Sequence, residues 1–524
     1  MRWFHNAMMV LVVLACLTGC KDDDSTPVTP DPEPVQTAGE LLQDIPGVTI
    51  LQTAKDIDGE DITVFSFEQP VDHTDASAGT FQQYCVLHYK GPDHVTVMHT
   101  QGYSTYEPDK FRQRHLAKNL DANFIEVEHR YYKHSLINFV EEQTDCTGDY
   151  WKFNTAAQST ADLHAIVTAL KATDGFKGKW VSTGTSKNGI LTALYAYYYP
   201  NDVDVYVPFC APFCTSEEDP GVGQWLTRRS GLDHGNETEL RRQIWAAFYR
   251  MIHDEALREE ITAIDNETRK GNLSVEASMN NVLYSFMANL FFKFCYYNTD
   301  TWDDVIPMEE NNHSAEVYYR FATLGSDDFS EKLNELRELL GLELEVIDGL
   351  DDDFGYLRVD EWDDETGAAM PAFGRRAAKK LKKEDFLKTI YCVHAATELG
   401  HFVFDWSVLP DDFPANDAEW LKKQYTVVPY NNSYNVEYDG GKLMKGFLDF
   451  VKNNRNNNKC KMLFIYGSND PWSGAAIPDP DASDPCVKKH IVANGVHSDD
   501  LNNPQKYSEE EKDWIMTTVK QMLQ

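Results

Sequence analysis

Three residues far apart in the sequence carry the side chains of a proton relay that ends in a nucleophile: Ser186, Asp470 and His497. Ser186 lies inside residues 179–197, where a strand-like pattern gives way to a helix-like one. A serine at such a sharp turn presents its hydroxyl above the sheet, and the N–H groups that open the helix point to the same place. One turn can therefore supply the nucleophile and, from the backbone N–H of Lys187, half of an oxyanion hole.

The turn Gly184-Thr185-Ser186-Lys187-Asn188-Gly189 departs from the usual Gly-x-Ser-x-Gly pattern. Asn188 stands where the second glycine belongs, and Gly189 comes one residue later. Short turns of this composition also join strands to helices without any catalytic role, so the motif by itself leaves an ordinary connection open. The other two residues decide between these interpretations.

Asp470 follows the buried-type strand at 462–466, and His497 lies in the loop that leaves the next strand. The carboxyl edge of an open α/β sheet is where such folds carry their sites. The order serine, aspartate, histidine is the order that the α/β-hydrolase fold uses. We therefore expect a triad in which His497 takes the proton of Ser186 while Asp470 holds the imidazole tautomer.

The triad needs a second oxyanion donor, and it needs no cofactor and no metal ion. The loop Gln101-Gly102-Tyr103 follows the strand-like run at 95–99 and occupies the expected place, so Gly102 and Tyr103 are candidates. None of the eight cysteines beyond the leader forms a Cys-x-x-Cys pair, so a zinc knot is not indicated. Cys460 and Cys486 flank one strand and loop and are the first guess for a disulfide.

Strands alternating with helices are predicted on both sides of a long interruption. The strand-like runs are 81–89, 95–99, 124–128, 179–181, 203–208, 461–466 and 488–492. A helix is expected to open at Thr155 and to bury Leu163, Ile166, Val167 and Leu170, which recur at spacings of three and four. This alternation predicts an α/β-hydrolase fold, a mostly parallel sheet with helices on both faces.

The interruption suggests how the domain is organised. Residues 45–214 and 436–524 are predicted to form the α/β core, and residues 215–435 a large helical cap inserted between them. Residues 21–44 are rich in proline, threonine and acids and are predicted to be a disordered tether.

The first twenty residues have the pattern of an export signal. Arg2 precedes an apolar run that ends in Leu17-Thr18-Gly19-Cys20, which looks like a bacterial lipobox, so we expect Cys20 to be lipidated. A plain secretory signal is the alternative. The expected location is the outer membrane, with the protein facing the periplasm or the cell surface.

Composition narrows the partners. The chain has 524 residues and a formal net charge of -36, so nucleic acid and anionic membrane surfaces are poor partners. We expect contact with a membrane only through the N-terminal lipid.

Several motifs together resemble the secreted tripeptidyl aminopeptidases, serine peptidases related to prolyl carboxypeptidase and dipeptidyl peptidase II. The motifs are Glu128-His129-Arg130-Tyr131-Tyr132, Gln158 with Ala161-Asp162-Leu163, Gly184-Thr185-Ser186-Lys187, Asp202-Val203-Asp204, Asp470-Pro471-Trp472 and the His497 loop. The match covers about 80–210 and 390–500. It implies an α/β-hydrolase core, a helical cap, and release of short peptides from free N-termini, often after proline. Asn188 departs from the family's glycine.

The resemblance also points to Glu398, because Thr397-Glu398-Leu399-Gly400 is similar to an element of the prolyl carboxypeptidase relatives. An aminopeptidase must hold the ammonium group of its peptide substrate, and a buried ammonium needs a carboxylate. Glu398 is the candidate anchor; a structural hydrogen-bonding role is the alternative.

Two other functions are compatible with these residues. The same triad could serve an esterase, because ester and amide cleavage share its chemistry. A surface lipoprotein that binds peptide or glycan without catalysis is the third possibility, although all three triad residues are present.

Overall fold

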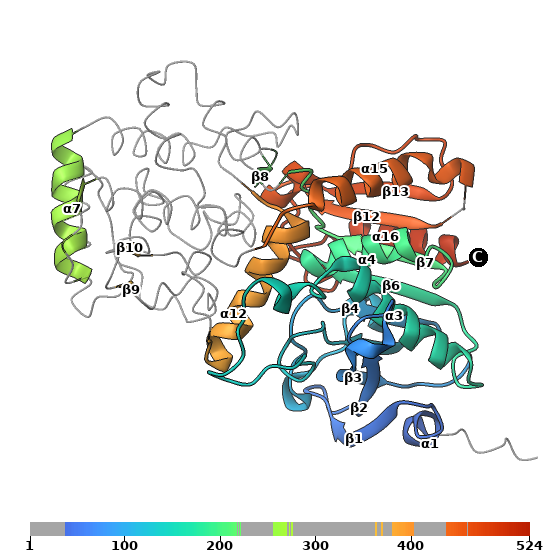
Figure 1. Ribbon diagram of the computed structural model, residues 1–524. Helices are drawn as coiled ribbons and strands as arrows, with labels where there is room; N and C mark the ends of the chain where they lie inside the picture. Colours follow the sequence, from blue (N-terminus) through green and yellow to red (C-terminus); the bar gives the residue numbers. More distant parts are fainter. Residues whose placement is uncertain are drawn as a thin grey trace, which may run out of the picture. The chain divides into compact units, whose positions relative to one another are not determined.

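The computed structural model describes residues 37–216, 218–219, 221, 255–269, 272, 274–275, 362–363, 368–369, 380–402, 436–457 and 460–524 (Figure 1). The predicted signal with Cys20 and most of the predicted cap lie outside the described residues. The sequence predicts a tether up to residue 44, whereas Ala38–Leu42 forms helix α1. Thr37 and Glu40 make a capping box there, and Leu41 and Leu42 are buried, so ordered structure begins earlier than predicted.

The largest sheet in the described residues has nine strands in the order β1-β2-β3-β5-β4-β6-β7-β12-β13. The strands are β1 (Val48–Lys55), β2 (Asp61–Pro70), β3 (Thr80–His88), β4 (Thr96–Thr100), β5 (Asn123–Val127), β6 (Trp180–Thr185), β7 (Val205–Phe209), β12 (Met462–Gly467) and β13 (Val487–Val492). From β5 onward every neighbouring pair is parallel, while β1, β2, β3 and β5 pair antiparallel. All seven predicted strands are present.

Helices lie on both faces of this sheet, as the α/β-hydrolase fold requires (Figure 1). They are α2 (His115–Asn119), α3 (Ala156–Lys171), α4 (Lys187–Tyr198), α15 (Gly440–Asn457) and α16 (Glu509–Leu523). Short 3₁₀ helices are η1 (Ala76–Ala78), η2 (Pro108–Lys110), η3 (Gly148–Trp151) and η6 (Pro471–Ala475). No helix among the described residues is long and apolar enough to cross a membrane.

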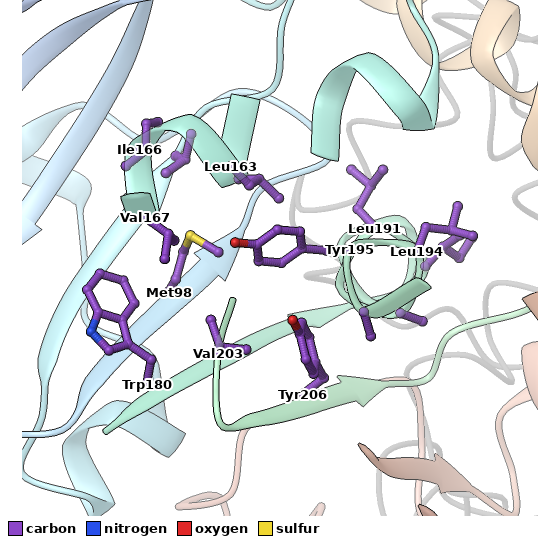
Figure 2. Close-up of a cluster of buried hydrophobic side chains, with 14 of the residues drawn as sticks. Met98, Leu163, Ile166, Val167, Trp180, Leu191, Leu194, Tyr195, Val203 and Tyr206 are labelled. Atoms are coloured by element: carbon purple, nitrogen blue, oxygen red, sulfur yellow. The ribbon is translucent and has the colours of Figure 1, made fainter. Parts of the chain in front are cut away.

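Alternate residues of each parallel strand enter two separate cores. One core packs α3, α4 and α15 against the sheet, and the other packs α2 and α16 against its opposite face. Figure 2 shows part of the first core, where Leu163, Ile166 and Val167 of α3 face Tyr195 of α4 across Met98 of β4. Helix α3 opens as predicted: the Thr155 side chain accepts a hydrogen bond from the N–H of Gln158 at 3.3 Å.

The described parts of the predicted cap connect closely to the core. Strand β8 (Glu218–Asp219) pairs in parallel with β11 (His401–Phe402), so the chain leaves and re-enters the core at neighbouring points. Helix α12 (Lys383–His394) runs into the π-helical segment η4 (Ala395–Leu399). Buried apolar residues of α12 form one cluster with residues 131–151 of the core. The other described elements of the predicted cap are α7 (Glu255–Arg269), β9 (Trp362–Asp363) and β10 (Ala368–Ala369), and β9 pairs antiparallel with β10.

The predicted disulfide is not formed in this structure. Cys460 and Cys486 are both thiols, and burial together with the nearby Cys486 raises the pKa of Cys460 to about 12. The sequence places the two cysteines near each other correctly, but it does not give the chemical state of the pair.

Candidate active site

Ser186 occupies the turn between β6 and α4 in a conformation that few serines adopt. Its φ is 61° and its ψ is −127°, a region that costs a non-glycine residue free energy. The turn is held on both sides: the N–H of Ser186 donates to the carbonyl of Phe209 at 3.0 Å, and its carbonyl accepts from Ile190 at 2.9 Å. A strained serine at the end of a central strand is the arrangement that exposes a nucleophile above the sheet.

The glycines of this turn explain why Asn188 is tolerated. A Cβ at Gly184 would lie 2.5 Å from the carbonyl oxygen of Asn188, and one at Gly189 would lie 2.6 Å from the carbonyl oxygen of Phe209. Both distances are too short for a side chain, so glycine is required at 184 and 189. The close approach to the neighbouring strand is made by residue 189, which leaves position 188 open to a larger residue.

The loop that was predicted to give the second oxyanion donor lies directly on this turn. The N–H of Gly102 donates to Oδ1 of Asn188 at 2.6 Å, and a Cβ on Gly102 would come within 2.9 Å of Cγ of Lys187. The N–H of Gly102 therefore already has an acceptor inside the protein, and Tyr103 is the other candidate that the sequence named.

Asp470 and His497 are hydrogen-bonded partners. Nδ1 of His497 lies 2.7 Å from Oδ2 of Asp470, and the Asp470 side chain is fully buried. The other carboxylate oxygen, Oδ1, accepts from the N–H of Trp472 at 3.0 Å and so fixes the rotamer. A carboxylate that holds Nδ1–H leaves Nε2 as the ring atom that can accept a proton.

Two neighbouring loops carry this pair, and backbone contacts tie them together. The N–H of Asn469 donates to the carbonyl of Gly495 at 2.8 Å, and the N–H of Asn494 donates to Oγ of Ser468 at 2.8 Å. A Cβ on Gly467 would lie 2.3 Å from the carbonyl oxygen of Gly495, so glycine at 467 is needed for the loops to meet.

The structure brings all three predicted triad residues to one edge of the sheet. Ser186 follows β6, Asp470 follows β12 and His497 follows β13, and β7 lies between the first two of these strands. Thr185 pairs with Phe209 of β7, which places Ser186 beside Cys210. The ligating atoms of Cys210, Asp470 and His497 all lie within 4.8 Å of one another.

Asp499 lies in the histidine loop, two residues after His497. Burial by itself would raise the pKa of its carboxyl, but the charge of Arg114, the nearby His99 and the Thr185 hydroxyl lower it below the ordinary value. Asp499 is half-buried, and the nearby charge of Arg114 stabilises its ionised form. The sequence analysis missed Asp499, although its position two residues after His497 was a usable signal.

Cys210 is a second residue that sequence reasoning missed. It has a φ of 48°, and its Sγ lies 3.8 Å from the carbonyl oxygens of Val496 and Ser498. Burial and then the charge of Asp470 raise the pKa of this thiol well above its usual value, so it is neutral. Cys210, Asp470 and His497 are the one set of side chains in the described residues that could ligate a metal ion, and two of them already bond to each other.

Glu398 lies at the amino terminus of α3. Its Oε2 accepts from the N–H of Ala156 at 2.5 Å and lies 3.3 Å from Nε2 of His394. Burial raises the pKa of its carboxyl to about 7, an effect that the bond from Ala156 partly offsets. The hydrogen bond from Ala156 is a structural role of the kind that the sequence analysis gave as the alternative to binding the substrate amine.

Two of the motifs that resemble the tripeptidyl aminopeptidases, around Arg130 and around Asp162, meet in one buried ionic network. Arg130 donates from Nε to Oδ2 of Asp162 at 2.8 Å and from Nη2 to Oδ1 at 2.7 Å, and both side chains are fully buried. His73 lies 2.7 Å from the same Oδ1. Such bidentate pairing positions backbone segments, here the loop after β5 against the middle of α3.

Comparison with known proteins identifies the family. The sequence model described as PS-10 peptidase S37 matches residues 30–319, more than half of the chain. The chain belongs to the S37 peptidase family. It is therefore a serine peptidase, and peptides are its class of substrate. The prolyl tri/tetrapeptidyl aminopeptidase of Streptomyces mobaraensis is 24% identical over 439 residues, which cover 82% of this chain and 73% of the relative.

Solved structures that resemble this chain do so with low TM-scores. The proline iminopeptidase of Mycobacterium smegmatis covers 87% of this S37 peptidase and 98% of its own chain, with 11% identity and a TM-score of 0.36. An α/β fold family hydrolase from Bacillus anthracis covers 90% and 100%, with 13% identity and a TM-score of 0.29. The strand order described above defines the fold of this peptidase.

Proposed function

We propose that this S37 peptidase is an exopeptidase that releases short peptides, chiefly tripeptides ending in proline, from free N-termini through an acyl-enzyme. The observation that carries the proposal is the hydrogen-bonded pair of Asp470 and His497, which lies at the same carboxyl edge of the sheet as Ser186. In this proposal Ser186 is the nucleophile, His497 the base and Asp470 the carboxylate that orients it, which are the roles that acyl transfer needs.

In the proposed reaction, Nε2 of His497 takes the proton of the Ser186 hydroxyl as Oγ attacks the scissile carbonyl carbon. The N–H of Lys187 and the N–H of Tyr103 donate to the oxyanion that forms. His497 then gives its proton to the leaving amine, and the C–N bond breaks to leave an ester on Ser186. Water, deprotonated by His497, hydrolyses this ester and restores the enzyme.

The substrate preference is proposed from the relatives. The S. mobaraensis protein is a prolyl tri/tetrapeptidyl aminopeptidase by name, and it is similar over most of this chain. A free N-terminus requires an anionic group in the cleft. Glu398 is the predicted anchor. Its carboxylate would have to bind the ammonium group of the substrate while it also accepts a hydrogen bond from the N–H of Ala156.

A fluorophosphonate probe and a substrate panel test the proposal. Wild-type protein should be labelled, Ser186→Ala should not be, and Ser77→Ala, a change at an exposed serine, should be labelled as the wild type is. The panel should pair tripeptides ending in proline, with free and with acetylated N-termini, against short acyl esters. Cleavage of esters alone would favour an esterase, and absence of any label would favour a silent binding protein.

Glu398→Gln on the same panel examines the anchor. A rise in KM confined to peptides with free N-termini would support the anchor. Equal changes on free and acetylated peptides would leave Glu398 with its capping contact.

The location is a separate proposal that rests on the leader sequence. We infer that Cys20 carries lipid and holds the peptidase at a bacterial membrane surface. Cys20→Ser should move the protein from the membrane fraction to the soluble fraction, and unchanged partitioning would exclude this anchor.

A further inference from the structure

Lys187, the residue after Ser186, carries a side chain that the reaction scheme does not use. The residue is buried, with 2% of its surface exposed, although lysine is among the residues least often buried. Burying an ammonium group is costly unless its surroundings compensate, so the position of this side chain calls for a physical reason.

Three tyrosine rings surround the ammonium group. Nζ of Lys187 lies 5.0 Å from the ring centre of Tyr103, 5.1 Å from that of Tyr132 and 5.7 Å from that of Tyr391. It also donates to the hydroxyl of Tyr132 at 3.4 Å. All three rings are within the distance at which a cation is attracted to an aromatic face. We call Tyr103, Tyr132 and Tyr391 the tyrosine cage.

The tyrosine cage is assembled from three separate segments. Tyr103 belongs to the loop proposed as second oxyanion donor, Tyr132 to the loop after β5, and Tyr391 to α12 of the inserted region. The rings also contact one another, since Tyr103 lies 6.0 Å from Tyr132 and 5.9 Å from Tyr391 between ring centres. One side chain, attached next to the nucleophile, is thus the common contact of all three segments.

Two histidines near Lys187, His129 and His394, are uncharged. Burial, and after it the charge of Lys187, lowers the pKa of His394 well below its usual value. The pKa of His129 is lowered well below its usual value in the same way, with His394 as a further cause. Both imidazoles are therefore neutral.

We propose that the Lys187 side chain is a positioning residue that uses the tyrosine cage to hold the oxyanion loop and α12 against the nucleophile turn. The inference rests on the assignment of Ser186 as the nucleophile. An oxyanion donor contributes only when it is placed correctly, and its contribution appears in the transition state. Loss of the Lys187 ammonium should therefore lower kcat and leave KM nearly unchanged.

The test compares Lys187→Met with Lys187→Arg. Methionine keeps the length of the side chain and removes the charge, whereas arginine keeps the charge and stacks on aromatic faces. We expect Lys187→Met to lower kcat and the fluorophosphonate labelling rate roughly tenfold to a hundredfold, with KM within about threefold. Lys187→Arg should recover most of this loss. Lys152→Met is the control, because Lys152 is exposed and its Nζ lies 4.8 Å from the ring centre of Phe153.

A second pair of variants keeps the proposal falsifiable if Lys187→Met does not fold. Tyr391→Phe retains the aromatic face and should lose less in both rates than Tyr391→Leu, which should lose roughly threefold to tenfold. Equal rates for these two variants, or wild-type labelling of folded Lys187→Met, would overturn the positioning role. Labelling of Ser186→Ala would instead overturn the assignment of the nucleophile on which the inference rests.

Discussion

The two sides of the nucleophile turn are built on different principles. On one side, Asp470 and His497 are placed by the register of parallel strands and by backbone bonds between two loops. On the other side, Tyr391 and Glu398 come from α12 and η4, which reach the core mainly through side-chain contacts, together with a backbone bond from the N–H of Asp439 to the carbonyl of Thr397 at 2.9 Å. The first side is rigid because the sheet fixes it. The second depends on buried charges and rings, so it should respond to pH and to single substitutions.

The largest expected effect is on the sheet side. Asp470→Asn keeps the size of the side chain but cannot stabilise the imidazolium that forms on His497. We expect kcat to fall by about four powers of ten with no loss of the folded state. Steady-state kinetics and thermal unfolding check this. The double variant Asp470→Asn, Ser186→Ala should be no less active than Ser186→Ala, because the residues act as a unit; multiplying losses would contradict a triad.

On the α12 side, we expect a single substitution to lower the free energy of unfolding. Arg130→Met removes the cation that Asp162 pairs with in a fully buried site. The loop that Arg130 holds, through the carbonyl of Phe153, is the surface on which α12 docks. Leaving a buried charge uncompensated typically costs about 3–5 kcal/mol in the free energy of unfolding.

Urea denaturation measures the effect of Arg130→Met, with Arg112→Met as the control. Arg112 lies 3.7 Å from Asp58 in an exposed pair, which should be worth about 1 kcal/mol or less. Similar losses in the two variants would mean that the buried pair has no special part in this region.

The same contrast decides what the sequence could predict. Apolar strand runs and the order of three residues were enough to place Ser186, Asp470 and His497 at one sheet edge, because parallel strands align their carboxyl ends. Strands β1 and β2 were not predicted. Strand β1 is largely exposed and carries no clear apolar pattern, whereas β2 is largely buried and its apolar residues were a usable signal. The tyrosine cage around Lys187 could not be predicted, because Tyr391 is about two hundred residues away in the sequence and no local pattern encodes its contact with Lys187.

The free energy of unfolding should depend on pH through Glu398, on the α12 side. The folded-state pKa of Glu398, about 7, lies above its ordinary value of 4.5, so the folded protein binds this proton more tightly than the unfolded chain does. The contribution of this carboxyl to stability should therefore decline as pH rises from about 4.5 to about 7. Glu398→Gln keeps an oxygen that can accept from the N–H of Ala156 but cannot ionise. It should remove roughly 1–3 kcal/mol of that decline.

Urea unfolding at about pH 5 and at about pH 8 measures the slope for the wild type and for Glu398→Gln. Burial also raises the pKa of Glu128 to about 7, which adds to this decline, whereas the lowered pKa values of His129 and His394 act in the opposite direction. The effect of Glu398 is therefore the difference between the two slopes. An unchanged slope in Glu398→Gln would show that Glu398 does not titrate in this range.

The smallest expected effect lies where the two sides meet, at Asn188. Its Oδ1 accepts the N–H of Gly102 and so joins the first turn of α4 to the oxyanion loop. Asn188→Gly restores the glycine of the usual motif but removes this bond, and one buried hydrogen bond is worth about 1 kcal/mol. We expect kcat to fall by up to about tenfold.

Glycine also weakens a helix by about 1 kcal/mol, so Asn188→Ala, which loses the same bond without that penalty, is the matched variant. Equal kcat losses in both would assign the effect to the contact with Gly102. A gain in kcat for Asn188→Gly would show instead that the side chain at 188 hinders the turn, and that the usual glycine suits this peptidase better.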